Sequence, residues 1–123
     1  MSDEKPASDY ADKLRLYEAA VATLPEVERK GAANPYTSVN GNMFSLFRPP
    51  GELALRLPAD ERERFLKTFN TVLFEAYGAV MKEYVLAPDS LLADTAALGR
   101  YLQVSYAYAK TLRPKPTTRK VKR

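Results

Sequence analysis

The sequence predicts an α+β domain: an antiparallel sheet, made of a three-stranded meander and one later strand, with helices packed on one face. Asn40-Gly41 lies between two short β-prone runs and is a strong hairpin signal, because both residues tolerate positive φ. Arg48-Pro-Pro-Gly51 predicts a second turn. Apolar residues recur at helical spacing both before and after this central stretch.

Length and composition fit one globular domain, with 123 residues of which 46% are hydrophobic and 28% are charged. We expect residues 1–8 to be a disordered lead-in, 9–112 to form the domain and 113–123 to be a basic, disordered tail. Of the 19 basic residues, six lie in 113–123, so the other 13 face 15 acidic residues and the remaining chain has a net charge of −2.

The sequence contains no cysteine and no histidine. This composition excludes thiolate nucleophiles, Ser-His-Asp catalysis and nearly every zinc site. We therefore predict a non-enzymatic protein with no catalytic residues, no cofactor and no metal. No apolar run approaches the roughly 20 residues of a membrane span, and the polar start lacks the core of a signal peptide. We expect a cytoplasmic protein with no membrane partner.

The first predicted helix covers residues 9–24, with Ser8 as its N-cap and Pro25 closing it. One stripe of this helix is apolar: Tyr10, Leu14, Tyr17, Val21 and Leu24. Residues 26–30 read as a short extended segment that leads through a loop to the hairpin.

The two turns fix a register for the meander. A tight first turn pairs Val39 with Asn42 and Tyr36 with Ser45, and the second turn pairs Leu46 with Leu53 and Phe44 with Leu55. This register places six apolar residues beneath the helices: Val39, Phe44, Leu46, Leu53, Leu55 and Leu57. It leaves five residues on the opposite face: Tyr36, Met43, Phe47, Ala54 and Arg56.

Two further helices and a strand follow the meander. Residues 58–70 predict a helix that turns Phe65, Leu66 and Phe69 inward, and residues 79–86 predict a strand. Residues 71–78 fit either a helical turn or a buried connector. Asp89 and Asp94 each offer a helix start. The last helix covers 95–112 and has one face formed by Leu98, Tyr101, Leu102, Ser105, Tyr108, Ala109 and Leu112.

The opposite face of the meander is the first candidate site. Tyr36, Met43, Phe47 and Arg56 would form a contact surface for a second copy or another protein, because contiguous exposed apolar residues often mark such surfaces. The alternative is that residues 71–78 or the N-terminal arm cover this face. A low-ranked reading places a small ligand in a cleft near Tyr36, Asn42 and Tyr84.

The basic tail is the second candidate. Its cations could neutralise phosphates of a nucleic acid, but no aromatic residue interleaves to stack on bases, so binding would be weak and non-specific. The residues concerned are Arg113, Lys115, Arg119, Lys120, Lys122 and Arg123. In the later strand, Lys82 and Glu83 point to opposite faces, which favours an ordinary cross-strand ion pair over a catalytic pair.

Four segments in this order resemble small stand-alone bacterial proteins similar to the TfoX/Sxy N-terminal domain. They are Pro35-Tyr-Thr-Ser-Val-Asn-Gly-Asn-Met-Phe-Ser-Leu-Phe47, Leu53-Ala-Leu-Arg-Leu-Pro58, Met81-Lys-Glu-Tyr-Val85 with Pro88 and Leu91-Leu92, and Tyr106-Ala-Tyr-Ala-Lys-Thr-Leu-Arg-Pro-Lys-Pro116. The resemblance covers residues 10–116. It implies a compact domain with an antiparallel sheet and a non-enzymatic regulatory or interaction role.

Overall fold

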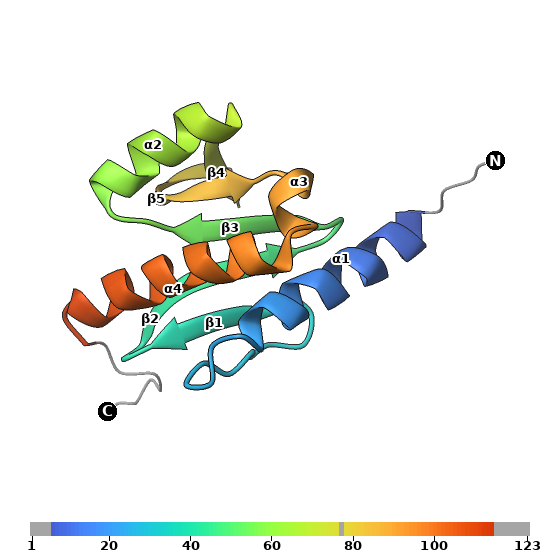
Figure 1. Ribbon diagram of the computed structural model, residues 1–123, viewed down its shortest axis with the longest axis horizontal. Helices are drawn as coiled ribbons and strands as arrows, with labels where there is room; N and C mark the ends of the chain where they lie inside the picture. Colours follow the sequence, from blue (N-terminus) through green and yellow to red (C-terminus); the bar gives the residue numbers. More distant parts are fainter. Residues whose placement is uncertain (1–5, 77, 115–123) are drawn as a thin grey trace.

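The computed structural model describes residues 6–76 and 78–114 of the chain (Figure 1). The elements in chain order are α1 (Pro6–Val21), β1 (Tyr36–Val39), β2 (Asn42–Arg48), β3 (Glu52–Arg56), α2 (Ala59–Phe69), β4 (Leu73–Ala76), β5 (Ala79–Ala87), α3 (Asp89–Leu92) and α4 (Thr95–Thr111). The predicted α+β class is confirmed.

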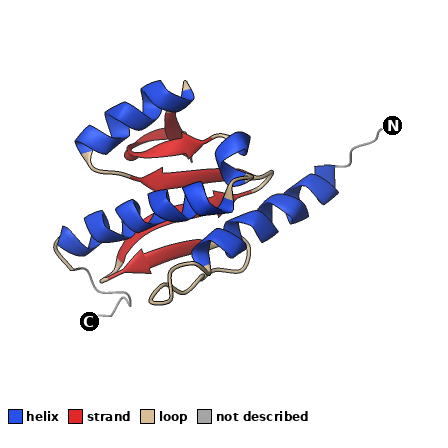
Figure 2. Ribbon diagram, in the orientation of Figure 1, coloured by secondary structure: helices blue, strands red, loops and turns tan. Residues whose placement is uncertain are grey.

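The five strands form one antiparallel sheet in the order β1-β2-β3-β5-β4. Helix α4 packs against β1, β2 and β3 and against α1, while α2 packs against β5. Figure 2 shows the helices on one side of the sheet, with α1 and α4 running across it. All four helices contribute buried residues to one core: Tyr17 from α1, Phe65 from α2, Leu91 from α3 and Leu98 from α4. The prediction that the helices cover one face is therefore confirmed.

Local sequence signals explain where most helices begin and end. Asp94 caps α4 as predicted, because its carboxylate accepts a hydrogen bond from the Ala97 backbone N–H at 3.1 Å. Helix α2 follows Pro58 and ends at Asn70 in a left-handed conformation, with φ of 52°. Helix α1 already begins at Pro6, so the expected lead-in 1–8 is wrong for residues 6–8; residues 1–5 lie outside the described residues.

The segment 71–78 was predicted to be a helical turn or a connector, and this prediction is wrong. It contains β4, which pairs with β5 as a hairpin. Gly78 lies in the turn of this hairpin with φ of 76°, a value that favours glycine. The strand has the alternation Leu73-Phe-Glu-Ala76, in which Phe74 and Ala76 are buried and Glu75 is exposed. Four residues are too short a run for this pattern to stand out from a helical turn.

A β-bulge in β2 changes the predicted register of the meander. The pairs Val39–Asn42 and Ser38–Met43 form as predicted, but Thr37 then pairs with Ser45, so that Phe44 has no partner across the ladder. Tyr36 pairs with Leu46 in place of Ser45. The second turn also differs from the prediction, because Arg48 pairs with Glu52 across a three-residue turn, and Leu46 therefore pairs with Ala54 and not with Leu53.

The bulge exchanges the faces of two large residues. Phe44 and Ser45 both face the helices, so Leu46 lies on the far face and Phe47 lies in the helix-side core, the reverse of the prediction. Phe47 is fully buried and its ring stacks on Tyr17 at 5.5 Å between centroids. The assignments of Val39, Phe44, Leu53, Leu55 and Leu57 to the helix-covered face are correct.

A chain of buried hydroxyl groups stabilises the bulge from the helix side. The hydroxyl groups of Tyr17 and Ser45 lie 2.6 Å apart, and those of Ser45 and Thr37 lie 2.5 Å apart. Since all three residues are fully buried, these bonds replace the water that each hydroxyl group loses on folding. Burial also raises the pKa of Tyr17 to about 12, although the bonds to Ser45 and Thr37 act against this shift.

Candidate functional site

The far face of the sheet carries a second, smaller apolar cluster. Its buried members are Leu46, Ala54, Phe74, Ala76 and Tyr84, and its partly buried members are Tyr36, Met43, Met81 and Leu86. Two of the buried residues, Phe74 and Ala76, come from β4. Segment 71–78 therefore covers part of this face, which is the alternative that the sequence left open.

Of the predicted contact surface, Phe47 does not lie on the far face of the sheet. Tyr36 and Met43 lie on the far face, but both are half-buried in its cluster. Arg56 Nη1 donates to the Met43 carbonyl at 3.3 Å, and Phe47 lies on the opposite face in the core. The prediction that Phe47 belongs to this surface is wrong, because the bulge at Phe44 moves Phe47 to the helix-covered face. The alternation of apolar residues in the sequence does not reveal this bulge.

Arg56, Glu83, Tyr84 and Tyr108 form a group of polar contacts that we call the polar rim. Its Nε donates to Glu83 Oε1 at 2.7 Å, and its guanidinium lies 5.6 Å from the centre of the Tyr84 ring. Tyr84 OH donates to the Met43 carbonyl at 2.8 Å, and Tyr108 OH donates to Glu83 Oε2 at 2.9 Å. The expected cross-strand ion pair of Glu83 is therefore present, with Arg56 of β3 as its partner.

The rim holds Glu83 as a carboxylate. Partial burial raises the pKa of Glu83, but the hydrogen bonds from Arg56 and Tyr108 and the charge of Arg56 outweigh this and lower it below its usual value. Burial, followed by the bond to Glu83, raises the pKa of Tyr108. Both oxygens of the carboxylate are bonded, so the arrangement fits a structural ion pair that ties α4 to β3 and β5.

Two of the three residues of the predicted small-ligand cleft, Tyr36 and Tyr84, belong to the far-face cluster. Asn42 is buried, and its amide donates to the carbonyl groups of Asn40 at 3.5 Å and Arg113 at 3.0 Å. The amide thus anchors the chain just after α4, and the small-ligand cleft stays a prediction.

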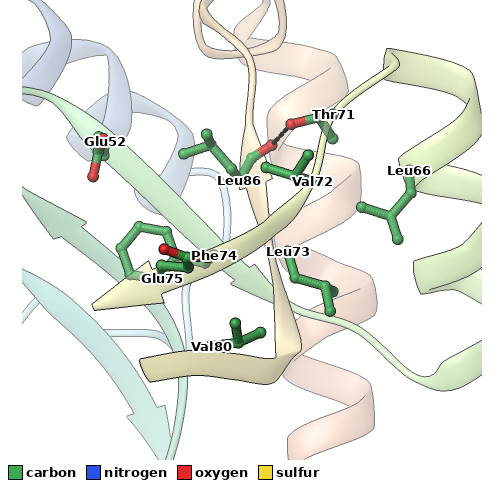
Figure 3. A pocket seen from close by; sticks show the side chains of 9 residues that line it. All are labelled: Glu52, Leu66, Thr71, Val72, Leu73, Phe74, Glu75, Val80 and Leu86. Atoms are coloured by element: carbon green, nitrogen blue, oxygen red, sulfur yellow. Dashed lines mark hydrogen bonds between the residues drawn. The ribbon is translucent and has the colours of Figure 1, made fainter. Parts of the chain in front are cut away.

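A groove beside β4 is the site that the sequence did not reveal. It has a volume of about 680 Å³ and is lined by Glu52, Leu66, Thr71, Val72, Leu73, Phe74, Glu75, Val80 and Leu86 (Figure 3). In Figure 3, Leu66 approaches from α2 and Glu52 lies on β3. Thr71 and Val72 come just before β4, and the other side chains lie on β4 and β5. The Thr71 hydroxyl donates to the Leu86 carbonyl at 2.8 Å and ties the start of β4 to β5. We call this site the β4 groove.

Two exposed valines distinguish the β4 groove from the rest of the surface. Val72 is 62% exposed and Val80 is 46% exposed, and within the described residues these are the large hydrophobic side chains with the most exposure. Both line the groove. Strand β4 is also an edge strand, since it pairs with β5 alone in the described part of the chain. Exposed aliphatic groups beside an edge strand are the features that favour strand addition.

The basic tail begins beside the β1–β2 turn. Arg113 is exposed, and its carbonyl accepts the bond from Asn42. Lys115, Arg119, Lys120, Lys122 and Arg123 lie outside the described residues, so the prediction of nucleic-acid contact there stays a prediction.

Residues 6–76 and 78–114 contain no cluster of three or more His, Cys, Asp or Glu residues that could hold a metal ion. No helix within them has the length and apolar character needed to span a bilayer.

Comparison of the chain with models of known protein families and with curated protein sequences finds no match.

Proposed function

We propose that this chain is a small, non-catalytic protein-interaction module that binds an extended segment of a partner protein along β4. The observation that carries this proposal is the coincidence of an edge strand, a groove and two exposed valines at one place. A segment that pairs with β4 would bury Val72 and Val80 and would satisfy the outer backbone groups of the strand.

The composition of the groove supports an extended partner. Its lining is mainly aliphatic, from Leu66, Val72, Leu73, Val80 and Leu86. Main-chain hydrogen bonds to an edge strand give affinity, while an apolar groove selects alternate side chains of the added segment. Partly buried Leu66 and Leu73 pack against the helix-side core, so the groove wall is anchored to the larger of the two apolar clusters.

The resemblance to the TfoX/Sxy N-terminal domain is consistent with this proposal and stays a prediction. A regulatory role of that kind requires a partner-binding surface, and we assign that surface to the β4 groove. The absence of cysteine and histidine from the sequence favours an interaction role over catalysis. The cytoplasmic location likewise stays a prediction from the sequence.

A peptide array tests the proposal with the full-length chain. Peptides of about ten residues that vary in apolar and charged content are screened, and hydrogen exchange then maps the binding site of each ligand. We expect bound peptides to slow exchange of the amides in residues 72–76. The Val72→Gln/Val80→Gln variant should bind about tenfold more weakly, because the apolar contacts are lost while the charge is unchanged.

Ala107→Gln is the matched control, since Ala107 is exposed on α4 away from the groove. This variant should bind as the wild type does. Peptides that bind the double variant and the wild type equally, or that leave the exchange of β4 unchanged, would refute the proposal.

A further inference from the structure

The basic segment 113–123 follows α4 in the chain. It contains six of the 19 basic residues and no acid. Its first residue lies beside the β1–β2 turn, where Asn42 holds the Arg113 carbonyl. Figure 1 shows that the C-terminal end of α4 lies near this turn. The turn is towards the β1 edge of the sheet, and β4 is the opposite edge.

The β4 groove is complementary in charge to this segment. Its nine lining residues include two acids, Glu52 and Glu75, and no base. Both carboxylates are exposed, and neither forms an ion pair within the described ranges. The C-terminal end of α2, at Asn70, leads directly into Thr71 on the groove wall, and the negative end of the helix dipole also favours cations there.

The sequence of the basic segment suits strand addition. Pro114 and Pro116 lie at its start, and residues 117–123 contain no further proline, so each of them has a backbone N–H that can join a sheet edge. Three of these seven residues are β-branched: Thr117, Thr118 and Val121. Seven extended residues span about 23 Å, which exceeds the length of about 13 Å of the four-residue strand β4.

We propose that residues 115–123 of one copy bind in the β4 groove of a second copy, pairing with β4 and placing Lys and Arg side chains against Glu52 and Glu75. This inference rests on the proposed function of the groove and names its occupant. Val121 is the large apolar side chain of the segment and contacts the valines of the groove.

The sheet order explains why the groove belongs to a second copy. Strands β3 and β5 lie between β2, beside whose turn the segment starts, and β4 at the other edge of the sheet. Crossing three strand spacings takes about 14 Å and pairing with β4 takes about 13 Å more, which is nearly the whole extended length of about 30 Å of residues 115–123. Reciprocal exchange between two copies avoids this crossing, and it gives a closed, two-fold symmetric dimer.

A charge exchange in the full-length chain tests this inference. One variant, Lys120→Glu/Lys122→Glu, reverses charge in the basic segment, and the other, Glu52→Lys/Glu75→Lys, reverses charge in the groove. Each variant alone opposes like charges, so its dimerisation should weaken about tenfold relative to the wild type. An equimolar mixture restores both attractive contacts and should form a heterodimer, which sedimentation velocity over about two decades of concentration would detect.

Glu28→Lys/Glu63→Lys is the matched control, because both residues are exposed and lie outside the groove. This variant carries the same change in net charge as the groove variant and should dimerise as the wild type does. Circular dichroism would verify that every variant keeps the fold.

Several outcomes would overturn the inference. A mixture that stays monomeric would overturn exchange between copies, and a segment that binds its own molecule would give this result. If Lys120→Glu/Lys122→Glu abolishes a gel shift with duplex DNA and leaves sedimentation unchanged, the segment serves nucleic acid instead. A monomeric wild type whose β4 still binds peptides from the array would refute this inference and leave the proposed function intact.

Discussion

The two faces of the sheet differ in how they are covered. The helix-covered face carries a core to which all four helices contribute, and its Phe44, Phe47 and Leu55 are fully buried. Within residues 6–76 and 78–114 no helix contributes to the far-face cluster, and Phe74 and Ala76 of β4 supply part of its cover. The thinner layer continues into the β4 groove, where Val72 and Val80 reach solvent. The comparison teaches that most of the buried core lies on the helix-covered face, whereas the groove proposed to bind a partner lies where the cover is thinner.

Replacing one large apolar residue on each face gives the largest expected contrast. Phe47→Ala removes a buried ring that contacts Tyr10 and Tyr17, and it should lower the free energy of unfolding by about 4 kcal/mol. Leu46→Ala, in the smaller far-face cluster, should cost about 2 kcal/mol, because the hairpin cover can relax into the space. Urea unfolding at neutral pH measures both changes.

Equal costs for these two substitutions, or a larger cost for Leu46→Ala, would show that the far face is as firmly packed as the helix-covered face. An unchanged m-value in both variants is the control that the unfolded state is the same.

Removing one phenolic hydroxyl group from each face compares the two faces through a smaller change in the free energy of unfolding. Tyr17→Phe breaks the chain of buried hydroxyl groups with Ser45 and should destabilise the protein by about 1.5 kcal/mol. Tyr84→Phe removes a bond to the Met43 carbonyl, which also accepts from Arg56, and should cost about 0.5 kcal/mol. Thermal unfolding compares the two variants, and a larger loss for Tyr84→Phe would contradict this ranking.

The Tyr17 phenol also has a pH signature. Its pKa is about 12 in the folded protein, against its ordinary value of 10.0 in the unfolded chain. Its contribution to stability is therefore complete below pH 10 and is lost as the pH rises towards 12. The difference in unfolding free energy between the wild type and Tyr17→Phe should shrink over this range, and a constant difference would show that the phenol ionises equally in both states.

The rim between the faces gives the smallest expected effect. The pKa of Glu83 is lowered in the folded protein, so the ion pair with Arg56 stabilises the fold above the unfolded value of about 4.5 and is lost as the pH falls through the lower folded value. Glu83→Gln should cost about 0.5 kcal/mol at pH 7, since the pair is partly exposed. The difference in unfolding free energy between the wild type and Glu83→Gln should vanish in acid. Chemical unfolding at several pH values measures it, and a difference that persists in acid would contradict this prediction.

The sequence by itself determined the α+β class, the two meander turns and the positions of α2, β5 and α4. These features depend on local chemistry, such as the tolerance of Asn40-Gly41 for positive φ and the capping carboxylate of Asp94. The resemblance to the TfoX/Sxy N-terminal domain was also read from sequence and stays a prediction.

Only the tertiary structure decided which face received Leu46 and Phe47. Their positions follow from the bulge at Phe44, which is held by Tyr17, a residue 28 positions away from Ser45 in the chain. The β4 groove also depends on contacts between distant segments, since α2, β3, β4 and β5 all line it. A sequence pattern reports the alternation along one strand, whereas bulges, edges and grooves arise from what other segments place against that strand.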